Sequence, residues 1–575
     1  MYIETVPNRH SPPCVLLRES YRVGGKVKKR TVANLTHWPA DLVAKLRVLL
    51  QGGAAIPSLE SAFPITRSRA HGAVAAVLGT LRRLGVEKLL SPRPSPERDR
   101  VVAMIVARVL WPASKLATAR ELGELTGSST LAELLAVESV TADELYAALD
   151  GLGERQEALE NALARKHGGE GMLLLYDVTS TYFEGRACPL ARRGYSRDGK
   201  RDKLQLVIGL LCTGEGIPLA VEVFEGNTPD TQTVAAQIAK IRGRFGLRRV
   251  VLVGDRGMLT EARLREDVRP VEGLEWITAL TAPQVRALVE TRMLQPSLLD
   301  EWGLAEIHSP DYPGERLIVC RNPLLADERA RQREDLLRAT EKELDRIGAA
   351  ARREKRPLRG RERIGLRVGK VLGRYKMAKH FQLTITDDAF TYERRADRIR
   401  EEAAVDGLYI IRTSVSAADL AAGNVVSAYK RLSTVERAFR SLKSVDLQVR
   451  PIHHHLAGRV RAHVFLCMLA YYVEWHMRQA LAPLLFDDAD PQLAEAGRES
   501  PVAPARRSPA AQRKVQTQQT EDGFPVQSFR SLLRSLSTIV KNHVQPLDPA
   551  WPAFDQTTRP NPLQQRALDL LQVRI

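Results

Sequence analysis

Two short apolar runs, each followed directly by an aspartate, constrain the fold of this chain most strongly. The runs are Met172–Tyr176, which precedes Asp177, and Arg249–Gly254, which precedes Asp255. Apolar segments of this length are typical of buried strands in a sheet that is covered by helices. Aspartates at the ends of two neighbouring strands would lie together at the edge of that sheet. The alternative for each residue is a plain turn or helix-capping aspartate.

The segments between and after these runs predict an α/β fold. Two further strands, Leu204–Cys212 and Ile217–Val223, are joined by a hairpin turn at Thr213–Gly216. Thr231–Arg244 is predicted to be a helix, and Thr260–Arg265 begins another. The predicted order is strand, strand, strand, helix, strand, helix.

A third acid, Glu436, lies inside the predicted helix Tyr429–Leu442. An apolar stripe at helical spacing should face the core; it consists of Leu432, Val435, Phe439 and Leu442. Glu436 shares another face with Tyr429 and Lys443, seven residues away on either side, and Arg440 follows at i+4. Such a carboxylate can bind a metal while its neighbours hold phosphates. The alternative is an ordinary amphipathic helix with a Glu–Arg pair worth a few tenths of a kcal/mol.

The order of the three acids matters more than any one of them. Two metal ions about 3.5–4 Å apart can organise phosphoryl transfer, and Mg²⁺ prefers carboxylate oxygens together with water and substrate phosphate. We therefore predict that Asp177, Asp255 and Glu436 are the catalytic and metal-binding residues. The predicted cofactor is a pair of Mg²⁺ ions, with Mn²⁺ as a substitute.

The charge of the chain favours a polyanionic partner. The formal net charge is +18 and the pI is about 9.8, so DNA, RNA or an anionic membrane surface is expected, unless the charge only serves solubility. The segment from Arg186 to Lys203 contains seven Lys or Arg, two Asp and Tyr195. Backbone phosphates attract such a segment; the alternative is a solvated loop. Its predicted DNA-binding residues are Arg197, Lys200, Arg201 and Lys203.

Several classes of protein are disfavoured. The five cysteines form no CxxC pair, so a structural zinc site is not expected and a reducing cytosol fits best. The N-terminus lacks the apolar core of a signal peptide. The longest apolar run, Val464–Val473, is too short to span a bilayer. We expect a soluble cytoplasmic protein with no membrane partner, associated with the nucleoid if the source is bacterial.

Composition and periodicity divide the chain into seven parts. They are a β or irregular segment at 1–60 with a Gly24–Gly25 turn, a helical DNA-binding or dimerisation region at 61–168, a first core part at 169–270, an insertion at 271–405 with a charged helix at 327–356, a second core part at 406–482, a linker at 483–525 and a helical tail at 526–575. The linker is inferred from its richness in Pro, Ala, Arg and Gln.

Several motifs together resemble the DDE transposases of bacterial insertion sequences, over roughly residues 170–480. The resemblance is to the branch with a Tyr-Arg-Glu-Lys signature around the final Glu. The matching segments are Leu175–Phe183, Gly194–Arg201, Gly216–Leu219, Phe224–Asp230, Val253–Met258, Tyr429–Lys443, Arg450–His453 and Arg459–His463. The signature has Arg three residues after the Tyr, where this chain has Leu432. Arg440 and Lys430 are candidate replacements.

The resemblance implies an RNase H-like catalytic core interrupted by a β-rich insertion. It also implies metal-dependent cleavage at element ends, strand transfer into target DNA, binding of terminal inverted repeats and a homodimer in a synaptic complex. Tyr429, Arg440 and Lys443 would position phosphates. Trp276 and Trp302 are candidates for stabilising a flipped base during excision through a hairpin, with a core role as the alternative. The residues are also compatible with an RNase H-like nuclease without strand transfer and with a non-catalytic DNA-binding protein derived from a transposase.

Overall fold

The chain divides into two compact units. One comprises Met1–His71 and Ile539–Arg559, and the other comprises Gly72–Thr538 and Pro560–Ile575. The computed structural model describes all residues except 10, 54–58, 170, 248, 292, 295–298, 300–302, 499, 504–505 and 548–550.

The first unit contains two small antiparallel sheets. Strands β1 (Tyr2–Val6), β2 (Cys14–Val23) and β3 (Lys26–Asn34) form one sheet in that order. Gly24 and Gly25, both with positive φ, make the turn between β2 and β3, as expected for a two-residue hairpin. Helices α1 (Ala40–Leu50) and α2 (Leu59–Ala62) follow. In the second sheet, β15 (Val540–Val544) pairs with β4 (Ile65–Ala70) and with β16 (Phe554–Thr557).

The second unit is built on a mixed eight-stranded sheet. Its order is β10-β11-β14-β9-β8-β5-β6-β7. The strands are β5 (Met172–Tyr182), β6 (Gln205–Thr213), β7 (Pro218–Glu225), β8 (Val250–Gly254), β9 (Leu274–Ala279), β10 (Leu304–Ile307), β11 (Arg316–Arg321) and β14 (Leu408–Thr413). Neighbouring strands from β5 to β7 are antiparallel, whereas β8 pairs in parallel with both β5 and β9. The predicted α/β class is confirmed. The predicted order is confirmed as well, because α10 (Val234–Ala239) lies between β7 and β8 in the chain and α11 (Glu261–Arg263) follows β8.

Helices pack against the β7 side of this sheet around one central helix, α18 (Ala457–Leu481). Its residues are buried on nearly every side, as expected of a helix that is apolar all round. The neighbouring helices are α3 (Gly72–Arg83), α5 (Pro96–Leu110), α8 (Ala142–Glu154) and α22 (Pro562–Leu571). The shorter helices of the predicted helical region are α4 (Val86–Leu90), α6 (Lys115–Leu122), α7 (Leu131–Leu135) and α9 (Gln156–His167).

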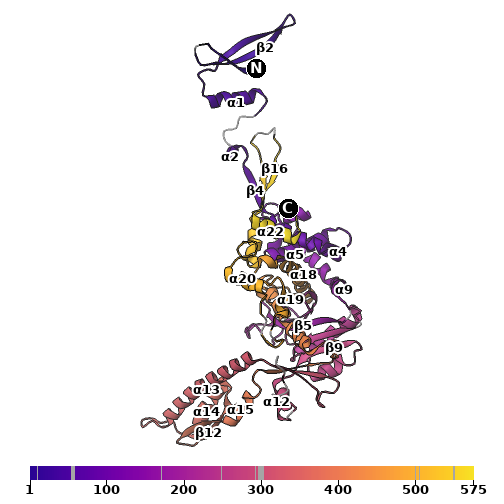
Figure 1. The fold of residues 1–575 in the computed structure, drawn as a ribbon, viewed down its shortest axis with the longest axis vertical. Coiled ribbons are helices and arrows are strands. Elements are labelled where there is room, and N and C mark those ends of the chain that lie inside the picture. Colours follow the sequence, from indigo (N-terminus) through magenta and orange to yellow (C-terminus); the bar gives the residue numbers. More distant parts are fainter. Residues whose placement is uncertain are drawn as a thin grey trace. The chain divides into compact units, whose positions relative to one another are not determined.

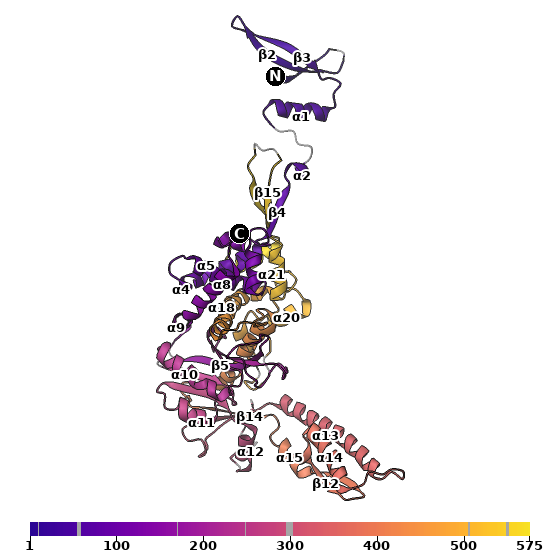
Figure 2. The ribbon, with the colours of Figure 1, turned by 180° about the vertical axis from the view of Figure 1, so that it is seen from behind.

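The segment 271–405 differs from the expected β-rich insertion. Its strands β9, β10 and β11 belong to the main sheet, and most of the remainder is helical. The other elements are α12 (Ala282–Glu290), α13 (Pro323–Ala351), α14 (Arg361–Tyr375), α15 (Ala396–Ala403), β12 (Phe381–Ile385) and β13 (Phe390–Arg394). Figures 1 and 2 show α13, α14, α15 and β12 gathered together. Leu337 and Leu344 of α13 pack into a core of their own with residues of α14, β12 and β13, so the charged helix is only partly solvated.

The prediction of a flexible linker at 483–525 is wrong for most of that segment. It contains α19 (Pro491–Ala496) and α20 (Pro509–Thr517), which begin at the N-caps Asp490 and Ser508. Each has Pro at a first-turn position, where Pro favours a helix start, so the prolines here mark helix starts and not flexibility. The buried Lys514 donates to the carbonyls of Ala482, Leu485 and Asp487 at 2.7–2.9 Å. Helix α21 (Phe529–Ser537) follows, as expected. The predicted helical tail at 526–575 is wrong between its two helices, α21 and α22, because β15 and β16 lie there and pair with each other and, through β15, with β4.

No single helix in the described part of the chain is long and apolar enough to cross a bilayer. Helices α5 and α6 pass that test only as a pair, and they meet at a bend of 100°.

Gly209 of β6 makes room for Tyr176, which is one of the largest fully buried side chains of the protein. Tyr176 is 1% exposed, and its ring lies over Gly209. A Cβ atom at residue 209 would stand 2.5 Å from the Tyr176 hydroxyl oxygen and 3.0 Å from a ring carbon. Because interiors are packed at crystal-like density, the ring cannot shift freely.

We expect Gly209→Ala to lower the free energy of unfolding by about 1–3 kcal/mol, the usual range for overpacking. Gly151→Ala is the control, because a Cβ in that helix meets nothing within 4 Å and Ala favours a helix over Gly. Urea unfolding followed by circular dichroism measures both. Equal stability of the two variants would contradict this account of the β5–β6 contact.

Candidate active site

The register between β5 and β8 brings the two aspartates side by side. Their parallel pairing ends with Tyr176 opposite Gly254, so Asp177 and Asp255 follow the last pair on adjacent strands. Asp177 is not at a strand end, contrary to expectation, because β5 continues to Tyr182 along β6. The polar Thr and Ser residues after Asp177 remain paired with β6. What ends at this point is β8, and that leaves the edge of β5 open beside Asp177.

Glu436 comes from a helix that is broken. The expected continuous helix consists of α16 (Ala422–Lys430), α17 (Leu432–Arg440) and a π-helical turn, η6 (Ser441–Val445). Val435 and Phe439 of α17 are buried, as predicted, while Glu436 is exposed on the other side. Tyr429, on α16, donates its hydroxyl to Asp255 Oδ1 at 3.2 Å. Burial and the charge of Asp255 raise the pKa of the Tyr429 hydroxyl, so it remains a donor.

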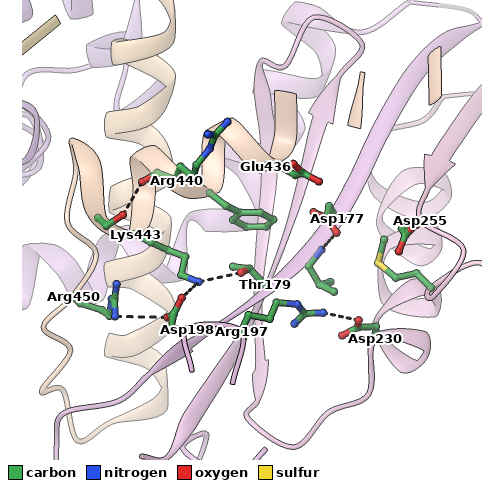
Figure 3. A pocket seen from close by; sticks show the side chains of 14 residues that line it. Asp177, Thr179, Arg197, Asp198, Asp230, Asp255, Glu436, Arg440, Lys443 and Arg450 are labelled. Atoms are coloured by element: carbon green, nitrogen blue, oxygen red, sulfur yellow. Dashed lines mark hydrogen bonds and ion pairs between the residues drawn. The ribbon is translucent and has the colours of Figure 1, made fainter. Parts of the chain in front are cut away.

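All three acids line one cavity of about 430 Å³ (Figure 3). The lining residues are Asp177, Val178, Thr179, Arg197, Asp198, Asp230, Asp255, Met258, Glu436, Phe439, Arg440, Lys443, Ser444 and Arg450. In the part of the chain that the structure describes, no three His, Cys, Asp or Glu side chains stand close enough to hold one ion between them. The acids therefore share a cavity without forming a closed cage.

The electrostatics of Asp177 suit a cation. Burial, together with the negative charges of Glu436 and Asp255, raises the pKa of Asp177 to about 7. The Val178 backbone N–H, which donates to Asp177 Oδ1 at 2.8 Å, and the Arg197 guanidinium oppose that rise. A carboxylate held near other carboxylates gains most from a positive ion, which favours the charged form of each. This donor set of carboxylate oxygens is the type that Mg²⁺ takes.

The basic segment at 186–203 is not a free, solvated loop. Arg192 and Gln205 exchange two backbone hydrogen bonds of 3.1 and 2.7 Å. Farther along, the Arg197 backbone N–H donates to Ser180 Oγ at 2.9 Å, and its guanidinium pairs with Asp230 at 2.6 Å. Arg197 therefore lines the cavity. The other three predicted DNA-binding residues, Lys200, Arg201 and Lys203, are exposed and do not line it.

Lys443, a predicted phosphate-binding residue, lines the cavity, but its partners are not evident from the sequence. Its ammonium donates to Thr179 Oγ1 at 3.2 Å and to the Ser180 carbonyl at 2.7 Å, and lies 2.7 Å from Asp198 Oδ1. Arg450 also reaches Asp198, at 3.6 Å, and its guanidinium lies 4.2 Å from the centre of the Tyr182 ring. Sequence reasoning missed the roles of Asp198, Asp230 and Arg450. Each of the three lies in a segment that carries the family resemblance, and Asp198 is one of two acids within the basic segment at 186–203.

Comparison with protein families decides the identity. The model described as "Transposase DDE domain" matches residues 169–473. The chain belongs to the DDE transposase family. The model described as "IS1634 family transposase, N-terminal domain" matches residues 3–57, which indicates a transposase of a bacterial insertion sequence.

Comparisons with individual proteins add little to the family assignment. A search of curated proteins gave no match. Among solved structures, the chain is similar to a piggyBac transposase in a cryo-EM synaptic complex with hairpin DNA. The identity is 9% and the TM-score 0.33, over 81% of this chain and 76% of that one. A likeness of this strength carries no structural argument.

Of the two candidates to replace the missing signature arginine in this transposase, only Arg440 faces the cavity. The Lys430 ammonium donates to the carbonyls of Pro501, Val502 and Ala503 at 2.6–3.0 Å, so its donors are already used. Leu432 itself is half-buried at the start of α17.

Trp276 and Trp302 are the two candidates for stabilising a flipped base. Trp276 lies in β9 and is 5% exposed, and the Arg269 guanidinium lies 5.7 Å from the ring. Trp276 is therefore part of the sheet core in this structure. Trp302 lies outside the described residues.

The attachment of the basic segment can be tested at Gly194. A Cβ atom there would stand 1.8 Å from the Gly226 carbonyl oxygen, so Gly194→Ala must push the segment off the sheet. We expect faster trypsin cleavage within residues 186–203, because exposed, locally unfolded segments are cut first. Mass spectrometry of early fragments locates the cuts. Gly169→Ala, where a Cβ meets nothing within 4 Å, is the control, and identical cleavage patterns would refute the tight approach.

Proposed function

We propose that Asp177, Asp255 and Glu436 are the catalytic carboxylates with which this transposase cuts DNA at the ends of its element and joins them to target DNA. The observation that carries the proposal is the convergence of three acids, remote in the chain, on one cavity. Family membership makes the enzyme a polynucleotidyl transferase and endonuclease.

The metal requirement follows from the chemistry of the lining. DDE transposases generally use divalent metal ions, and we propose two Mg²⁺ ions, with Mn²⁺ as a substitute, held by Asp177, Asp255 and Glu436. When bound, such ions activate the nucleophile and stabilise the leaving oxygen of a phosphodiester. The three side chains have to draw together on a shared ion, since no three acids of the described chain are yet close enough.

The neighbouring side chains have positioning roles in this proposal. Tyr429 orients Asp255 through its hydroxyl. Arg440 and Arg197 line the cavity, where their guanidinium groups would bind backbone phosphates in the bidentate manner that arginine favours. Lys443 would bind a phosphate through its ammonium group, which acts as a point charge. Outside the cavity, the exposed Lys200, Arg201 and Lys203 would extend the phosphate-binding surface along the DNA.

The sheet supports an RNase H-like core as the catalytic framework. From β7 through β6, β5 and β8 to β9, three antiparallel strands are followed by two parallel ones. We propose that the segment between Asp255 and Glu436, which adds β10, β11, β14 and the α13–α15 group, is an insertion into this core. The helical region at 61–168 would serve DNA binding or dimerisation.

The substrates would be the terminal inverted repeats of the element and a target duplex, bound by a homodimer that holds two ends together. The enzyme would act in the bacterial cytoplasm on nucleoid DNA. The alternative is a nuclease on the same core that cuts without joining.

Removal of one acid tests the site. We expect Asp177→Asn to lower cleavage of element-end DNA by about a thousandfold, because loss of metal catalysis costs several kcal/mol of transition-state stabilisation. DNA binding should be kept, as measured by fluorescence anisotropy. Asp327→Asn, which removes an exposed acid on α13, should leave both unchanged. Full cleavage by the Asp177 variant would reject the assignment.

A joining assay separates transposase from nuclease activity and tests the cofactor. We expect a pre-cut element end to be joined to a target plasmid when Mg²⁺ is supplied and not in excess EDTA, with Mn²⁺ restoring the reaction. Joined products are counted by sequencing across the junctions. Metal-dependent cutting of ends without any joining would favour the nuclease alternative.

A further inference from the structure

The ammonium group of Lys443 has no donor to spare. A lysine ammonium carries three N–H donors. Lys443 has three acceptors around it, Thr179 Oγ1, the Ser180 carbonyl and Asp198 Oδ1, at 3.2, 2.7 and 2.7 Å. The first two lie on β5 next to Asp177 and fix the ammonium beside the catalytic acids. A DNA phosphate can therefore reach Lys443 only by taking the place of Asp198.

The place that Asp198 occupies fits a larger anion better than a carboxylate. Within the described part of the chain, Asp198 Oδ2 is buried without a hydrogen bond, and it lies 3.6 Å from the Arg450 guanidinium. The Nε of Arg450 is also buried without a hydrogen-bond partner among the described residues. The Arg450 guanidinium is held by the Tyr182 ring, whose centre lies 4.2 Å away. This contact fixes the position of the guanidinium but provides no hydrogen-bond acceptor for its Nε. Leaving buried donors and acceptors unpaired is costly.

We propose that Lys443 and Arg450 form a subsite for one DNA backbone phosphate, and that Asp198 occupies this subsite until DNA displaces it. The inference rests on the proposed function, which places DNA in this cavity. A phosphate offers more acceptor oxygens than a carboxylate and matches the guanidinium fork. It would satisfy the Arg450 Nε that Asp198 leaves unpaired.

The position of Asp198 in the chain allows this exchange. It belongs to a turn in which the Gly199 N–H donates to the Ser196 carbonyl at 3.3 Å. Gly199 has a φ of +72°, and a Cβ there would meet nothing within 4 Å, so the turn borders open space. Arg197, one residue earlier, remains attached through Ser180 and Asp230. Asp198 can leave the subsite while the rest of the segment stays docked.

A charge-removing pair of variants tests the exchange. Asp198→Asn removes the competing carboxylate, and Asp202→Asn removes an exposed acid four residues away. The probe is a short labelled duplex of mixed sequence, titrated without added divalent cations. We expect Asp198→Asn to bind roughly tenfold more tightly than the wild-type chain, since a partly buried ion pair competes more strongly than an exposed one. Asp202→Asn should change affinity far less. Equal gains in both variants, or weaker binding by Asp198→Asn, would overturn the proposal.

A second variant keeps the test open if Asp198→Asn fails to fold, as judged by its thermal melting curve. Arg450→Gln should weaken DNA binding and reduce the slope of log affinity against log salt by about one, the value for one lost phosphate contact. Arg242→Gln, an exposed residue of η2 (Lys240–Arg244), is its control. An unchanged salt slope would mean that Arg450 only supports the fold. Failure here leaves the Asp177 assignment untouched, because that assignment is judged by cleavage.

Discussion

The parallel pairing of β5 and β8 is the constraint on which the site depends. Parallel strands that stop pairing at Tyr176 and Gly254 put the next residue of each, Asp177 and Asp255, at one level on the sheet. Because β5 continues along β6, the backbone of Asp177 is held by the sheet on one side, while its side chain lines the cavity. The gap beside Asp177 is a consequence of where β8 ends. Helix α17 adds Glu436 to the site by lying across this gap. Helix α17 contacts β5, and its residues Val435 and Phe439 are buried while Glu436 is exposed.

Charge inside the cavity is arranged as pairs of opposite sign that DNA has to rearrange. Arg197 is paired with Asp230, and Lys443 and Arg450 share Asp198. Buried cations without partners would be expensive, so a site built to bind phosphate needs internal acids while it is empty of DNA. This explains why the acid Asp198 lies within the basic segment at 186–203. The net charge of +18 attracts DNA at long range. At the site itself, a DNA phosphate binds by replacing the acids that are paired with the cationic side chains.

The sequence is a good guide wherever burial sets the pattern. Apolar runs locate β5, β6, β7 and β8, and the stripe of α17 indicates which of its faces is buried. It is a poor guide where polar groups are satisfied by tertiary contacts. Thr179 to Thr181 continue a strand although they resemble a loop, and the Pro-rich stretch at 483–525 contains capped helices around the buried Lys514. Neither the break at Arg431 nor the partners of Lys443 can be derived from spacing, because they depend on residues distant in the chain.

Leucine at position 432 shifts the balance of charge across the cavity. Leu432 begins α17 and extends its apolar side, so no cation enters the site from the turn before Glu436. Lys430 is held by the carbonyls at 501–503, which excludes it as well. The positive groups that do line the cavity from this part of the chain, Arg440, Lys443 and Arg450, all follow Glu436 in sequence. Phosphates would thus be held mainly from the η6 side of the carboxylates, with Arg197 facing them from the basic segment. In this arrangement Arg440 would act from one helical turn after Glu436, whereas the arginine of the family signature would lie one turn before it, at the position of Leu432.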